Sequence, residues 1–130
     1  MDRMLVATAN PGKAREMVEI LRDLPLTVSG LDQFPDIQTC EETGASFSEN
    51  ARQKAFYYHE FTGLPTLADD SGLEVEALDA APGIYSARYA PQPEPEDQDR
   101  RRFLLQNLEG KPCPWKAAFQ CVVALCGPEG

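Results

Sequence analysis

The 130-residue sequence predicts an α/β fold in which helices flank a central β-sheet. Short apolar runs typical of strands alternate with segments whose apolar residues have helical spacing, and Gly and Pro separate these segments. In addition, 42% of the residues are hydrophobic, which is enough to bury a core. The length suits one domain, and we expect residues 1–130 to form it.

The composition excludes several classes of protein. A net charge of -9 argues against non-specific binding to nucleic acid or to a membrane surface. No apolar stretch approaches the ~20 residues that a membrane span needs, and the N-terminus lacks the pattern of a signal peptide. The four cysteines form no C-x-x-C pair and lie far from His59, so we expect free thiols in a cytoplasmic protein, with Cys121 and Cys126 in the core.

The N-terminal part of the chain predicts a strand, a helix and a second strand. Residues 4–7 are an apolar run that ends at a turn formed by residues 10–12. Residues 13–24 have helical spacing and are followed by a proline, and residues 26–28 are typical of a strand. We expect residues 30–43 to form a loop.

The start and end of the second helix are marked by sharper signals. Ser46 and Glu49 have the spacing of a capping box, in which each side chain binds a backbone amide at the helix start. The helix is predicted to run to about Thr62, because Gly63 and Pro65 are typical of a helix end.

The C-terminal part predicts two further strands and a helix. Residues 66–68 form a short predicted strand that ends at residues 69–72, and residues 73–77 form an extended segment. A third helix is predicted over residues 97–108. Residues 116–125 are apolar-rich and predict a long buried strand.

The first candidate site is the junction between the first strand and the first helix. Backbone amides at a helix N-terminus attract anions, Gly12 permits a close backbone approach, and Lys13 adds positive charge, so a phosphate chain is the expected ligand. Ala14 stands where a Walker A loop has Ser or Thr, so this is a different kind of loop. An ordinary turn with a helix cap is the alternative. The candidate loop comprises Thr8, Ala9, Asn10, Pro11, Gly12 and Lys13.

The second candidate site is the pair Asp69 and Asp70 at the end of a predicted strand. Open α/β sheets place their ligands at the carboxyl ends of strands, and Mg²⁺ prefers one or two carboxylates plus water and phosphate. The alternative is a type I turn, which Asp, Ser and Gly favour.

The third candidate group joins Glu41 and Glu42 to Lys54 in the second helix. Both features are compatible with an exposed surface, but Lys54 is one position away from the predicted apolar face and could border a cleft. An acidic protein would repel a triphosphate unless a cation intervened. Carboxylates at Glu41, Asp69 and Asp70 could hold that cation, which points to metal-assisted hydrolysis of a phosphoanhydride.

Taken in order, these motifs resemble those of the inosine triphosphate pyrophosphatase family, the non-canonical purine NTP or dITP/XTP pyrophosphatases. The resemblance covers essentially the whole chain. It is carried by Thr8-Ala9-Asn10-Pro11-Gly12-Lys13 with Glu16, Glu41-Glu42-Thr43-Gly44, Ser46-Phe47, Glu49-Asn50-Ala51, Lys54-Ala55, Thr62-Gly63-Leu64-Pro65, Leu67-Ala68-Asp69-Asp70-Ser71-Gly72-Leu73-Glu74-Val75, Ala81-Pro82-Gly83-Ile84-Tyr85-Ser86-Ala87-Arg88-Tyr89 and Phe119-Gln120-Cys121.

The resemblance implies the family's mixed-sheet fold and Mg²⁺-dependent hydrolysis of ITP, dITP and XTP to the monophosphate and pyrophosphate by a cytoplasmic homodimer. By position, Asp70 would accept the proton and bind the metal together with Glu41, with Glu42 as the alternative ligand. The residues expected to contact substrate are Thr8, Ala9, Asn10, Pro11, Gly12, Lys13, Lys54 and Ser71.

The sequence departs from the family at its C-terminal end. Family members continue into a Phe-Gly-Tyr-Asp-type motif and a Ser-His-Arg motif that hold the purine base, and neither occurs here. We therefore expect the N-terminal portion of the domain, without its C-terminal segment. Two alternatives follow: an incomplete fragment that binds nucleotide or a protein partner, and a pyrophosphatase with another base preference.

Overall fold

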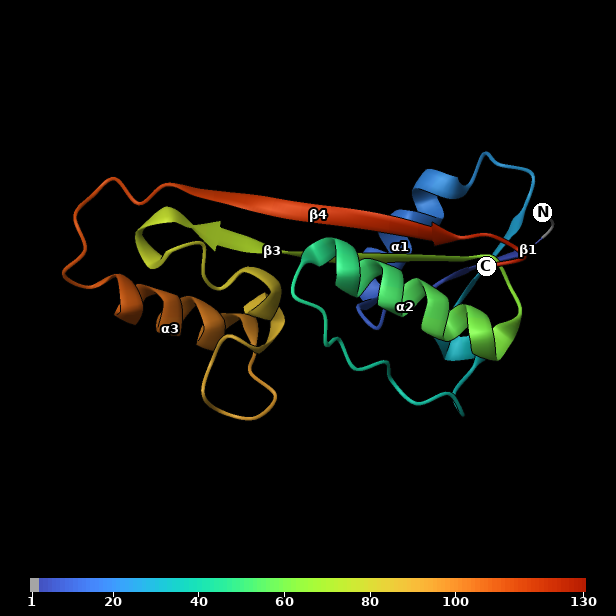
Figure 1. Ribbon diagram of the computed structural model, residues 1–130, viewed down its shortest axis with the longest axis horizontal. Coiled ribbons are helices and arrows are strands. Elements are labelled where there is room, and N and C mark those ends of the chain that lie inside the picture. The colour runs from blue at the N-terminus through green and yellow to red at the C-terminus, as the bar shows by residue number, and fades with distance from the viewer. Residues whose placement is uncertain (1–2) are drawn as a thin grey trace. The chain divides into compact units, whose positions relative to one another are not determined.

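A computed structural model describes residues 3–130 (Figure 1). Two compact units make up the chain: Met1–Asp70 with Val122–Gly130, and Ser71–Cys121. Strands β3 and β4 run through both units. The elements are β1 (Arg3–Val6), α1 (Pro11–Leu21), β2 (Thr27–Gly30), η1 (Leu31–Gln33), α2 (Phe47–Thr62), β3 (Thr66–Val75), η2 (Glu76–Leu78), η3 (Gly83–Arg88), α3 (Asp97–Leu108) and β4 (Ala117–Cys126), where η marks a 3-10 helix.

The four strands form one sheet in the order β2-β1-β3-β4. Strand β1 is parallel to both neighbours, with Val6 opposite Gly30 of β2 and opposite Leu67 of β3. Figure 1 shows β4 running in the opposite direction to β3. The sheet is therefore mixed and flanked by helices, which confirms the predicted fold class.

The core of the first unit lies between the sheet and α2. Leu5 and Ala68 of the sheet pack against Ala55 and Tyr58 of the helix. The Tyr58 hydroxyl also accepts a hydrogen bond from the Cys40 amide at 3.1 Å, which fastens the loop before α2 to the core. The helix is positioned both by its apolar face and by this buried polar contact.

The signals for α2 are confirmed, with one change of partner. The Ser46 hydroxyl accepts from the Glu49 amide at 3.1 Å, whereas the Glu49 carboxylate accepts from the Ala45 amide at 2.7 Å. Gly63 ends the helix in the left-handed region at φ +69°, and its amide donates to the His59 carbonyl. Local sequence thus determines where this helix begins and ends.

The predicted end of the strand at residues 69–72 and the alternative of a type I turn there are both wrong, because β3 is one continuous strand from Thr66 to Val75. Strand β4 lies beside it and supplies backbone partners. Asp69 and Asp70 therefore lie within a strand, where successive side chains point to opposite faces.

The predicted burial of the last strand is also wrong. Phe119, Val123 and Leu125 are 84%, 56% and 55% exposed. With Cys121, which is exposed rather than in the core, they share one face of β4, because they are spaced two residues apart. Cys126 on the other face is buried, as predicted, and all four cysteines of the chain are free.

The second unit is built around α3, whose bounds match the prediction. The Asp99 carboxylate accepts from the Glu96 amide at 2.9 Å and so forms a capping box with it. Tyr89 accepts a hydrogen bond from Asn107 at 2.7 Å, and its ring packs edge-on against Phe103. These contacts hold the segment around Tyr89 against the helix.

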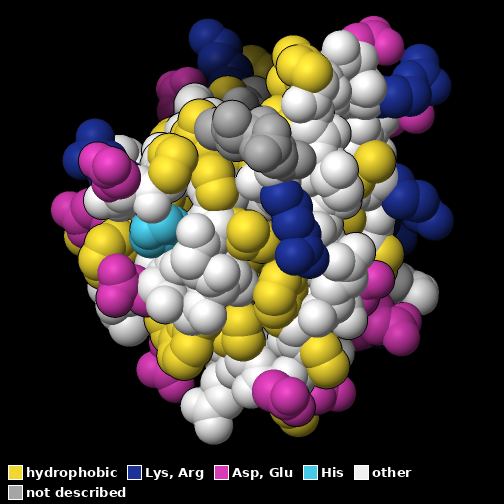
Figure 2. Space-filling model, turned by 90° about the vertical axis from the view of Figure 1, so that its right-hand side faces the viewer, with side chains coloured by type: hydrophobic (Ala, Val, Ile, Leu, Met, Phe, Trp, Pro, Cys, Tyr) yellow, Lys and Arg dark blue, Asp and Glu magenta, His cyan; other side chains and the backbone are white. Residues whose placement is uncertain are grey.

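The surface is mixed in character. On the face drawn in Figure 2, hydrophobic side chains reach the surface among acidic and basic ones. Within residues 3–130, no helix has both the length and the apolar character needed to cross a bilayer.

The cap of α2 gives a first testable prediction. Replacing Ser46 by Ala removes the acceptor for the Glu49 amide and should lower the free energy of unfolding by about 1 kcal/mol. Urea unfolding followed by circular dichroism measures the change. Ser48→Ala, within the first turn of the same helix, is the control and should have little effect; equal losses in the two variants would contradict the cap assignment.

Candidate functional site

The candidate site lies in the first unit, where β1 ends and β3 continues. The chain leaves β1 toward α1 and β2 on one side, while β3 lies on the other side of β1. Such a switch in strand order is where open α/β sheets bind ligands. The Thr8–Lys13 loop follows β1, and Asp69 and Asp70 extend beyond the last β1–β3 contact, in which the Ala7 amide donates to the Leu67 carbonyl.

The Thr8–Lys13 loop forms a well-made helix start. The Asn10 side chain accepts from the amides of Gly12 at 2.9 Å and Lys13 at 3.2 Å, and the Thr8 hydroxyl accepts from the Asn10 amide at 3.2 Å. Pro11 is the first residue of α1. The two amides that follow Pro11 are thus bound by Asn10, so the alternative of a turn with a helix cap describes this geometry. Ala9 lies between these residues and is exposed.

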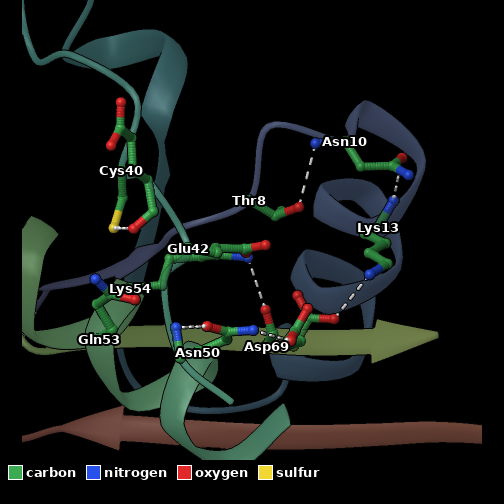
Figure 3. A network of polar contacts seen from close by, with 12 residues as sticks. Thr8, Asn10, Lys13, Cys40, Glu42, Asn50, Gln53, Lys54 and Asp69 are labelled. Carbon is green, nitrogen blue, oxygen red and sulfur yellow. Dashed lines mark hydrogen bonds and ion pairs between the residues drawn. The ribbon is translucent and has the colours of Figure 1, made fainter. Parts of the chain in front are cut away.

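Two lysines from different helices converge on Asp69, as Figure 3 shows. Lys13 of α1 forms an ion pair with the Asp69 carboxylate at 2.9 Å. Lys54 of α2 donates to the Asp69 carbonyl at 2.9 Å and forms an ion pair with Glu42. The side chain of Lys54 is only 19% exposed, so it borders the site rather than lying on an open surface.

Asp70 differs from Asp69 in its partner and its direction. It is 6% exposed, and one carboxylate oxygen, Oδ2, accepts a hydrogen bond from the side-chain amide of Asn50 in α2 at 3.1 Å. Asp69 contacts α1 through its side chain and Asp70 contacts α2, as expected for successive residues of a strand.

The environment of Asp70 favours its protonated form. Burial raises the pKa of its carboxyl above the ordinary 3.8, and the negative charges of Glu42 and Asp69 act in the same direction. The hydrogen bond from Asn50 and the charge of Lys54 oppose this shift in pKa. A buried carboxyl with a raised pKa is typical of a functional site.

The Glu41–Gly44 segment contributes one carboxylate to this group. Glu42 is half-buried, is paired with Lys54 and affects the pKa of Asp70, whereas Glu41 is exposed. Ser71 follows Asp70 in β3, is half-buried and belongs to the second unit.

Sequence reasoning missed Asn50 as a site residue. It lies one turn before Lys54 on α2, and residues four apart share a face of a helix. That spacing was available in the sequence. The contact with Asp70, which is 20 residues away, was not.

The donor set fits a metal ion that is shared with a substrate. In the part of the chain that the structure describes, no three His, Cys, Asp or Glu side chains are grouped to hold a metal. Mg²⁺ needs fewer protein ligands, because it keeps water and binds substrate phosphate. The carboxylate of Asp70, with Glu42 and Asp69 nearby, is a place where a divalent cation would relieve repulsion.

Two known proteins with similar sequences are named dITP/XTP pyrophosphatases. The chain is 50% identical to a dITP/XTP pyrophosphatase of Geobacter sulfurreducens and 44% identical to one of Desulforamulus reducens. The alignments cover 100% and 98% of this chain. The chain spans only 65% and 64% of the lengths of these relatives.

Two solved structures have folds similar to that of this chain. A HAM1 protein from Coxiella burnetii superposes with a TM-score of 0.85 at 42% identity, over 96% of this chain and 63% of that one. A nucleoside-triphosphatase / dITP/XTP pyrophosphatase from Mycobacterium abscessus gives 0.83 at 39% identity, over 98% and 67%. The sequence model of the Ham1 family matches residues 4–130. By sequence and by fold, therefore, the chain belongs to the Ham1 family.

Proposed function

We propose that this protein is a nucleoside-triphosphate pyrophosphatase that hydrolyses ITP, dITP and XTP to the monophosphate and pyrophosphate with Mg²⁺. One observation carries the proposal: the buried carboxyl of Asp70 lies beside an Asp69 that two lysines hold, at the switch point of the sheet. The names of the relatives support the same chemistry.

In this proposal the two lysines bind the phosphates. Lys13 and Lys54 point into the site from α1 and α2, and both are paired with carboxylates. A triphosphate would share these cations with Asp69 and Glu42, which keeps the lysines in place before substrate arrives. The Thr8–Lys13 loop, including Ala9 and Pro11, would border the phosphate chain. The Asn10 side chain would release the backbone amides of Gly12 and Lys13, which would then bind phosphate. Ser71 would contact substrate.

Magnesium would be held by Asp70 together with a glutamate of the segment before α2. Glu41 is the ligand that the resemblance implies, and Glu42 is the one that acts on the pKa of Asp70. When bound, Mg²⁺ supplies polarisation of the phosphoryl oxygens and neutralises charge. An acidic chain of net charge -9 needs such a cation to admit a triphosphate.

The residue proposed to handle the proton is Asp70. Its carboxylate would accept a proton from the attacking water. A raised pKa makes it a better base than an ordinary aspartate, because a base works best when its pKa approaches the working pH. Asn50 donates to Oδ2, and this leaves Oδ1 as the oxygen proposed to meet water.

The resemblance also leads us to propose a cytoplasmic homodimer. A preference for another base and binding without hydrolysis are the competing possibilities. Comparing pyrophosphate release from ITP and from ATP in the presence of Mg²⁺ separates them, because only our proposal requires release that favours ITP.

Replacing Asp70 by Asn should reduce pyrophosphate release from ITP by at least about 10²-fold, because the amide cannot accept the proton. Release is measured with Mg²⁺ at saturating ITP. Asp36→Asn, at an exposed position, is the control and should retain full activity. Full activity of the Asp70 variant would show that another group is the base.

Replacing Lys13 by Ala should raise the KM for ITP about 10-fold or more, because a charge-assisted contact with phosphate is lost. Initial rates over a range of ITP concentrations measure this change. Arg15→Ala removes an exposed positive charge from the same helix and serves as the control. An unchanged KM in the Lys13 variant would remove this lysine from the substrate site.

The raised pKa of Asp70 predicts how stability depends on pH. Below pH 3.8 this group is protonated in both the folded and the unfolded chain and has no effect. As the pH rises, the unfolded chain ionises first, so Asp70 lowers the free energy of unfolding, fully so above its folded pKa. Asp70→Asn should therefore stabilise the protein at pH 7 and have little effect at pH 3.5.

Urea midpoints of the wild type and of Asp70→Asn at the two pH values test this prediction. Asp36→Asn controls for the loss of one negative charge. A stabilisation that is the same at both pH values, or a loss of stability at pH 7, would contradict a raised pKa for Asp70.

A further inference from the structure

Asn50 connects Asp70 to the segment that carries the glutamates. Its amide nitrogen donates to Asp70 Oδ2 at 3.1 Å, and its amide oxygen accepts from the Gly44 backbone amide at 2.7 Å. We propose that Asn50 is a positioning residue that orients the Asp70 carboxylate relative to the Glu41–Gly44 segment. This inference rests on the function proposed above and assigns to that reaction a residue that touches neither substrate nor metal.

The two bonds of Asn50 fix the direction of its side chain. Because Oδ1 faces the Gly44 amide, Nδ2 must face Asp70, and the amide cannot be turned over without losing both bonds. Asn50 is only 1% exposed, so water does not replace either partner. A donor held in this way binds Oδ2 of Asp70 and leaves Oδ1 for the attacking water of the proposed reaction.

The segment is shaped to receive Asn50. A Cβ atom at Gly44 would lie 2.7 Å from the Asn50 amide oxygen and 2.7 Å from Cβ of Glu49, closer than real Cβ contacts. Glycine is therefore required for the backbone to approach α2 at this point. This close approach fixes the segment that contains Glu42 relative to α2.

Gln53 allows the two possible roles of Asn50 to be separated. It lies one turn further along α2 and binds the same segment twice: its oxygen accepts from the Thr43 amide at 3.0 Å, and its nitrogen donates to the Thr43 hydroxyl at 3.0 Å. Its bonds go to Thr43 and not to Asp70. Gln53 thus tethers the segment without acting on the carboxylate, whereas Asn50 does both.

The experiment compares Asn50→Ala, Asn50→Asp and Gln53→Ala in the full chain. Asn50→Asp keeps an acceptor for the Gly44 amide but loses the donor to Asp70. Four quantities are measured for each variant: kcat and KM for ITP with Mg²⁺, the affinity of the protein for Mg²⁺ alone by isothermal titration calorimetry, and the urea midpoint.

If Asn50 orients Asp70, both Asn50 variants should lose about 10-fold or more in kcat, with KM for ITP changed less than about threefold. Asn50→Ala should also bind Mg²⁺ more weakly than Gln53→Ala, even where their urea midpoints agree. A purely structural role would make Asn50→Ala resemble Gln53→Ala in kcat and in Mg²⁺ affinity, and would leave Asn50→Asp active. That result would overturn the inference.

The two proposals fail in different ways. A wild-type chain that releases no pyrophosphate but loses Mg²⁺ affinity in Asn50→Ala would refute the proposed function and keep the positioning role. Equal Mg²⁺ titrations for wild type and Asn50→Ala, flat ones included, would overturn the positioning role whether or not the chain is active.

Discussion

The burial of two adjacent carboxylates, Asp69 and Asp70, is the constraint on which the site depends. They are 3% and 6% exposed in a chain of net charge -9, so their own charge opposes folding. One lysine from each of two helices offsets this cost. Lys13 of α1 forms an ion pair with the Asp69 side chain, and Lys54 of α2 donates to the Asp69 carbonyl and pairs with Glu42. The start of α1 and the first half of α2 are therefore tied to the middle of β3, and this connection brings together groups that are far apart in sequence.

This arrangement treats the two carboxylates unequally. Asp69 has a full counter-charge, whereas Asp70 receives a neutral amide from Asn50 and keeps a raised pKa. A carboxyl with a raised pKa costs stability at neutral pH but is ready to accept a proton or a cation. Active sites commonly give up stability for function in this way. Carboxylates hold both lysines, so in the function proposed above these side chains would already be ordered for binding phosphate.

Much of the fold could be predicted because the signals were local. Ser46 and Gly63 mark the ends of α2 within a few residues, and the bounds of α3 match those predicted. The continuity of β3 through residues 69–72 was missed because Asp, Ser and Gly favour turns, whereas here this stretch is extended and pairs with β4. The apolar composition of residues 116–125 predicted a strand but not its exposure, because composition indicates which residues favour burial and not whether another element covers them. Similarly, the motifs pointed to Asp70 but not to Asn50, because the hydrogen bond between the two side chains joins residues that are 20 positions apart.

The alternation of β3 also has an evolutionary consequence. Because the Asp69 side chain contacts α1 and the Asp70 side chain contacts α2, a different helix holds each carboxylate. An insertion of one residue before Asp69 would exchange these two contacts, because a one-residue slip exchanges the two faces of a strand. We therefore expect natural relatives to tolerate few changes in the length of this strand.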